Sequence, residues 1–204
     1  MARTEILKDD HWQIRFVRHG DRWAHTVGVV LGDRLLPLLA SIESSQDELW
    51  PPSPPLKDLH LHDANGTTTA MLVGMAGNSH WSVTVQLAQG DPAVNFDIAC
   101  RIKDELPDAD DARKQVSPLS SSYRTMVCPT SESNQAAALM LDDLSIRISS
   151  DPVAGNEDTP AAIITTGDNS LQIAALPDAA ALPRTVRWNY CVRRSDIKRS
   201  TTLQ

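Results

Sequence analysis

Several features that would assign this chain to a common class of protein are missing. No apolar run approaches 18 residues, so the sequence predicts no membrane-spanning helix. The first residues, MARTEILKDDHW, carry acids where a secretory signal peptide needs an apolar stretch. The 19 Lys and Arg are outnumbered by 26 Asp and Glu, whereas a general nucleic-acid binder needs a basic surface. We therefore expect a soluble, cytoplasmic protein whose partners are neither membranes nor nucleic acids.

Cysteine is scarce, and the motifs of nucleophilic hydrolases are absent. The three cysteines, Cys100, Cys128 and Cys191, are odd in number, widely spaced and without a CxxC pair, which fits a reducing compartment. The chain contains no GxSxG motif, so nothing marks a serine as an activated nucleophile. Cys100 alternates with Phe96 and Ile98, which predicts a buried, inert thiol.

Alternation of apolar and polar residues with a period of two dominates the chain. The segment WQIRFVR (12–18) is an example, because it places Trp12, Ile14 and Phe16 on one side. Roughly ten such short strands with frequent turn signals predict an all-β antiparallel sandwich built from meanders, in one domain over residues 1–204. At most one or two short helices are expected. The alanine-rich segment 131–141 is compatible with either a helix or a strand.

Proline and acidic residues indicate where the segments that connect the strands lie. Pro37 predicts that the segment 34–44 is an edge strand or a bulged strand, because proline cannot donate a ladder hydrogen bond. The proline-rich stretch 48–57 is expected to be extended and stiff, and to cross between two parts of the fold. Residues 103–122 turn acidic and then serine-rich, which predicts a long polar surface loop.

Residues 56–103 form the most regular part of the sequence, and their turns fix a register. Asn65-Gly66 is a strong two-residue hairpin signal, and Gly77-Asn78 and Gly90-Asp91-Pro92 follow at similar spacing. A four-strand meander results, with two opposite faces. The face expected to be core carries Leu59, Leu61, Ala70, Leu72, Trp81, Val83, Val85, Phe96, Ile98 and Cys100. The opposite face carries four cross-strand rows: His60, Met71, Thr84 and Asp97; His62, Thr69, Gln86 and Asn95; Asp58, Val73, Ser82 and Ala99; and Met75, His80 and Arg101.

The pair His60 and His62 raises the question of a metal site. An HxH pair on a strand is a known ligand pattern, but the glutamate and glycines that accompany it in cupin-type sheets are missing. In the predicted register His80 lies two strands and four residues from His60, roughly 16 Å away. Zinc ligands converge within about 2.3 Å of one ion. We therefore expect no metal and no cofactor, while His19 or His25 remains able to approach the pair.

The polar face is the best candidate for a ligand site. Its members of interest are His60, His62, Thr84, Gln86, Asp97 and Arg101. Alternation of polar and apolar residues alone would also be explained by a sheet with one face exposed to solvent. However, Met71, Val73 and Met75 make the second strand apolar on both faces, which predicts cover by loops, another sheet or a partner.

Two functions follow from this face. The first is a non-catalytic binding or assembly module, whose partner is a second copy of the chain or a small polar ligand such as a sugar. The alternative is a carbohydrate-active or hydrolytic enzyme that uses the face around His60, His62 and Asp97. The first is preferred, because the predicted register brings together no acid, base and nucleophile.

Overall fold

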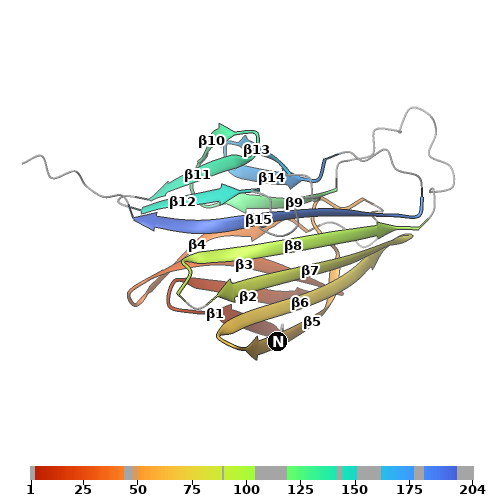
Figure 1. Ribbon diagram of the computed structural model, residues 1–204, viewed down its shortest axis with the longest axis horizontal. Coiled ribbons are helices and arrows are strands. Elements are labelled where there is room, and N and C mark those ends of the chain that lie inside the picture. The colour runs from red at the N-terminus through yellow and green to blue at the C-terminus, as the bar shows by residue number, and fades with distance from the viewer. Residues whose placement is uncertain are drawn as a thin grey trace, which may run out of the picture.

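Two stacked antiparallel sheets make up the described chain. The computed structural model describes residues 3–43, 48, 50–88, 90–103, 119–141, 144–150, 162–176 and 182–196. These residues form one sheet of seven strands and one of eight, which pack face to face as a sandwich (Figure 1). None of them forms a helix that could cross a membrane. The predicted all-β sandwich is therefore confirmed, whereas the single domain stays a prediction.

The chain passes between the two sheets repeatedly. The seven-stranded sheet has the order β1-β2-β3-β4-β9-β14-β13, with β1 Thr4–Lys8, β2 Trp12–His19, β3 Arg22–Leu31, β4 Arg34–Ser41, β9 Ser120–Thr125, β13 Ile163–Gly167 and β14 Ser170–Ala174. The eight-stranded sheet has the order β10-β11-β12-β15-β8-β7-β6-β5, with β5 Leu56–Ala64, β6 Thr67–Ala76, β7 Ser79–Ala88, β8 Ala93–Ile102, β10 Pro129–Ser133, β11 Ala136–Leu141, β12 Leu144–Ser149 and β15 Arg184–Asp196.

The proline-rich stretch leads from β4 in the first sheet to β5 in the second. Prolines donate no backbone hydrogen bond, so side chains hold this segment instead. The Ser53 hydroxyl donates to the Ser122 carbonyl at 3.0 Å and accepts from the Ser122 amide at 3.1 Å. The Ser120 hydroxyl donates to the Pro52 carbonyl at 3.1 Å. These hydroxyl contacts between the proline-rich stretch and β9 therefore fix the position at which the chain enters β5.

One expectation for the connecting segments needs correction. Residues 120–122 belong to β9 rather than to the expected loop 103–122, and their serines are buried. For residues 131–141 the sequence allowed a helix or a strand, and the segment contributes to two strands, β10 and β11. Residues 104–118 of the predicted loop lie outside the described part of the chain.

Pro37 lies in a bulged strand, as predicted, but not in an edge strand. The register of β4 against β3 shifts where Val27 pairs Leu39 and Gly28 pairs Pro37. β4 lies between β3 and β9, yet its ladder with β9 covers only Leu39–Ser41. The missing proline amide therefore lies where no ladder partner from β9 is needed.

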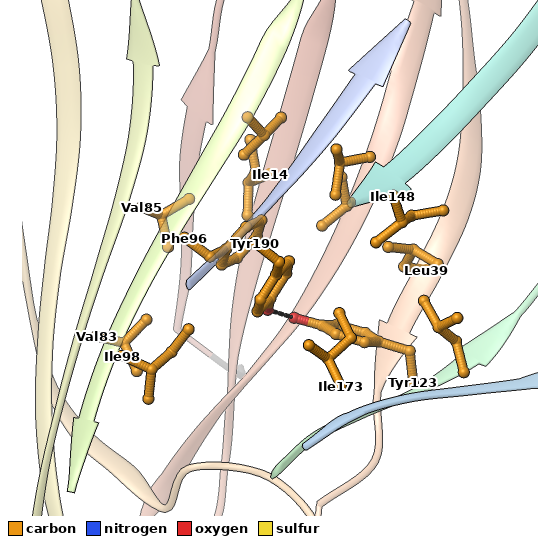
Figure 2. Close-up of a cluster of buried hydrophobic side chains, with 14 of the residues drawn as sticks. Ile14, Leu39, Val83, Val85, Phe96, Ile98, Tyr123, Ile148, Ile173 and Tyr190 are labelled. Atoms are coloured by element: carbon orange, nitrogen blue, oxygen red, sulfur yellow. Dashed lines mark hydrogen bonds between the residues drawn. The ribbon is translucent and has the colours of Figure 1, made fainter. Parts of the chain in front are cut away.

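The core lies between the sheets and receives large side chains from both. Trp12, Trp23, Trp81 and Trp188 are all buried, and the rings of Trp81 and Trp188 meet edge to face at 6.0 Å between centroids. Figure 2 shows apolar side chains of the two sheets interleaved around Tyr123 and Tyr190.

The predicted register of β5–β8 is confirmed. His60 pairs Met71, Met71 pairs Thr84, and Thr84 pairs Asp97. Asn65 and Gly66 both have positive φ, at 54° and 73°, as a two-residue type I′ turn requires. Of the ten residues expected in the core, Leu59 is half-buried and Leu61 is 41% exposed, because β5 is an edge strand.

A close backbone approach fixes the start of β5. A Cβ atom at Gly74 would lie 1.7 Å from the Pro55 carbonyl oxygen, so only glycine fits next to the Pro55 backbone. Opposite it, β5 shifts register between Leu56 and Asp58, which leaves Lys57 as an extra residue.

We predict that Gly74→Ala destabilises the protein by roughly 2 kcal/mol or more, because backbone must move to relieve the overlap. Gly167→Ala is the control, since its Cβ meets only the rotatable Ser170 hydroxyl at 2.5 Å. The free energy of unfolding from urea titration checks both. Equal losses in the two variants would contradict the tight approach at Gly74.

Candidate functional site

The outer face of the eight-stranded sheet carries the predicted polar rows and extends them. Pairing with β15 adds Asn189 opposite Asp97, Cys191 opposite Asn95, Arg187 opposite Ala99 and Thr185 opposite Arg101. The rows are thus continuous from the edge strand β5 to the sequence-distant strand β15.

A hollow of about 460 Å³ lies at one end of this outer face. It spans the first residues of β5 and the matching parts of β6, β7, β8 and β15. Its polar lining consists of Lys57, Asp58, His80, Ser82, Arg101 and Thr185. Its remaining lining consists of Val73, Gly74, Met75, Trp81 and Ala99. The hollow therefore combines an apolar base with polar and charged groups.

Charge of both signs lines the hollow. Lys57 brings a cation, and its Nζ lies 3.4 Å from a carboxylate oxygen of Asp21 in the turn between β2 and β3. The Arg18 guanidinium donates to the Lys57 carbonyl, which fixes the backbone at the bulge. Arg101 and Asp58 are exposed and lie in adjacent cross-strand rows. The hollow can therefore bind an anionic or a hydroxyl-rich group.

Only one of the six predicted site residues lines this hollow, namely Arg101. The other five lie on the same outer face but beyond its rim: His60, His62, Thr84, Gln86 and Asp97. Sequence reasoning placed Asp58, Ser82 and His80 on the correct face without naming them as a site. Lys57 and Thr185 were missed, because one depends on the bulge and the other on the β8–β15 pairing.

The described residues do not provide the cover expected over β6. Met71, Val73 and Met75 are 46%, 48% and 46% exposed in the described structure. Neither the second sheet nor another segment within the described ranges shields them. Val73 and Met75 instead line the hollow, and Met71 lies beside it along β6.

The histidines do not converge. In the confirmed register His80 pairs Met75, four residues along β6 from the partner of His60. Among the described residues no group of three His, Cys, Asp or Glu side chains could hold a metal ion. His25 lies between the sheets, packed against Phe96 at 5.9 Å between ring centroids, so it does not join the HxH pair.

A buried polar cluster lies inside the sandwich, around His25. Its Nε2 lies 2.9 Å from the Tyr123 hydroxyl, which in turn hydrogen bonds to the Tyr190 hydroxyl. Burial lowers the pKa of His25 to about 4 and raises the pKa of both tyrosines. These groups are therefore neutral at pH 7, and the hydrogen bond between Tyr123 and Tyr190 joins the two sheets (Figure 2). The sequence signal was weak, because His25 alternates with Trp23 and Val27 on an apolar face.

The remaining reactive group considered from sequence is also buried. Cys100 is fully buried on the inner face of β8, and desolvation raises its thiol pKa to about 12. A thiol with such a pKa is not an available nucleophile at neutral pH. The predicted burial of Cys100 in the core is confirmed.

Comparison with known proteins gives no further assignment. No protein-family model matches the chain, and no curated protein matches it in sequence.

The buried state of His25 predicts a pH dependence of stability. Its folded-state pKa lies near 4, below the ordinary value of 6.5, so the unfolded chain binds the proton more readily. Stability should fall as pH drops from about 6.5 towards 4, by about 3 kcal/mol from this group. We expect His25→Phe to lose this component while retaining the part due to carboxylates. Urea titrations of both proteins across this range provide the measurement, and identical pH profiles would refute the assignment.

Proposed function

We propose that the protein is a non-catalytic binding module whose site is the hollow on the outer face of β5–β8 and β15. The ligand is a small polar molecule such as a sugar. The observation that carries the proposal is the lining of the hollow, in which Val73 and Met75 lie beside Arg101 and Asp58.

The size and lining of the hollow support this role. Sites for small molecules have volumes of about 300–1,000 Å³, apolar surface and a few polar groups that fix orientation. Val73, Met75 and Ala99 offer apolar area to the carbon–hydrogen face of a sugar ring. The Ser82 and Thr185 hydroxyls can bond to its hydroxyl groups.

Arg101 is the group best suited to select among such ligands. A guanidinium presents several donors in a fixed plane and binds a carboxylate through two parallel hydrogen bonds. Lys57 lies at the opposite side of the hollow, on β5. An acidic sugar is therefore expected to bind more tightly than a neutral one.

The alternative role, a carbohydrate-active or hydrolytic enzyme using the face around His60, His62 and Asp97, has less support as a glycoside hydrolase. Asp58, the carboxylate in the hollow, lies three strands and two residues from Asp97, roughly 16 Å between Cα atoms. Paired catalytic carboxyl groups lie about 5–9.5 Å apart. Asp58 and Asp97 are thus poorly placed for that reaction.

We predict that Arg101→Ala weakens binding of glucuronate by roughly tenfold or more, because a bidentate charge-assisted contact is lost. Ala99→Trp should abolish the binding of neutral sugars as well, since the indole fills the hollow. Ligand-observed NMR with glucose, N-acetylglucosamine and glucuronate measures these effects.

Arg147→Ala is the matched control. Arg147 is an exposed arginine on β12 of the same sheet, paired with Glu132 and outside the hollow. Its replacement should leave sugar binding unchanged. Binding that survives Ala99→Trp, or that falls equally in the two arginine variants, would place the site elsewhere.

A further inference from the structure

We propose that β5 is a homodimer interface, in which the exposed edges of two copies pair antiparallel about a two-fold axis at His60. β5 ends the eight-stranded sheet, with β6 as its only strand partner among the described residues. An unpaired edge presents free backbone donors and acceptors that a second strand can satisfy. The inference does not depend on the identity of any ligand.

Strand length distinguishes this edge from the other three. β5 has nine residues, whereas the edge strands β1, β10 and β13 have five each. Natural sheets keep exposed edges short unless something pairs with them. β10 and β13 also lie close to one another, since the Ile164 amide donates to the Asn134 carbonyl at 2.7 Å. The long edge of β5 is therefore the candidate for pairing.

The sequence of β5 is complementary to itself in one antiparallel register. When His60 pairs with His60 of the partner subunit, Leu59 faces the partner's Leu61 and Asp58 faces the partner's His62. The two-fold axis repeats each of these contacts. Carboxylates thus meet imidazoles on the outer face, and leucines meet leucines on the inner face.

Exposure of Leu61 supports the same pairing. This side chain points towards the core side of the sheet, yet it is 41% exposed because no strand lies beyond it. In the proposed register it packs against the partner's Leu59, which is half-buried in the single chain. A second copy supplies both the apolar contact and an imidazole opposite each Asp58 carboxylate, and the two-fold axis provides each contact twice.

The pairing begins at Asp58, because the Lys57 carbonyl already accepts a hydrogen bond from Arg18. Asp58 also lines the hollow on the outer face. The partner's His62 would then lie opposite Asp58 at the rim. Dimerisation consequently adds a residue of the second copy to the edge of each hollow.

The first test compares two exposed edge residues. Light scattering should give twice the 22.3 kDa chain mass for the wild-type protein. Leu61→Asp should shift it to the monomer, with the dimer dissociation constant raised roughly tenfold or more. Ile163→Asp is the matched control, since Ile163 is a 37% exposed residue of the edge strand β13. It should remain dimeric.

The second test uses charge. His62→Asp places carboxylates opposite one another twice per dimer and should weaken association roughly tenfold. Adding Asp58→Lys to the same protein places a lysine opposite each of these carboxylates and should recover the dimer. Recovery in the double variant cannot result from misfolding, and thermal melting of all variants provides the folding control.

A monomeric wild-type protein at every concentration measured would overturn the proposal. So would a dimer that is unaffected by Leu61→Asp, or a double variant no tighter than His62→Asp alone. Light scattering measures dimerisation and ligand-observed NMR measures sugar binding, so the two proposals are tested separately. Loss of sugar binding in Arg101→Ala with an intact dimer concerns the hollow only.

Discussion

The alternation of side chains along β5–β8 is the constraint on which the rest of this structure depends. With a period of two, every residue assigned to one face fixes its neighbours on the other. Leu72, Val83 and Ile98 are buried against the first sheet, so Met71, Thr84 and Asp97 must point outwards. The apolar side of the meander therefore stabilises the sandwich and also determines what the outer surface presents.

Two local departures from this regularity shape the outer surface. The bulge at Lys57 breaks the strict alternation of β5 and brings Lys57 to the hollow together with Asp58. Gly74 allows the Pro55 carbonyl to approach the sheet, which fixes where β5 begins. The hollow lies where these two features meet the regular rows of β7 and β8. Its position thus follows from the entry of the proline-rich segment, which Ser53 anchors to β9.

How much the sequence predicted depended on whether the signals were local. Turn residues such as Asn65 and Gly66 determine the hairpin register directly, so the rows across β5–β8 were predicted correctly. The strand at Ser120–Thr125 was partly missed, because its serines are buried by contacts with a segment about 70 residues earlier. Exposure of Leu61 depends on strand order, which alternation alone does not determine.

The sequence predicted the sheet face on which the candidate site lies, but not which residues line it. Arg101 was named because it shares a face with the polar rows, and it does line the hollow. Thr185 joins it only through pairing of β15 with β8, more than 80 residues apart in the chain. The residues around His60 and Asp97 were favoured for their chemistry, yet the hollow forms over the two neighbouring rows, which contain Asp58 and Arg101.

The most direct test of the account is the cross-strand contact pattern of β6, β7 and β8, measured by nuclear Overhauser effects between backbone protons. The account predicts contacts between Met71 and Thr84 and between Thr84 and Asp97. A pattern displaced by one residue, with Met71 opposite Val83 or Val85, would turn the outer face into the core and contradict it.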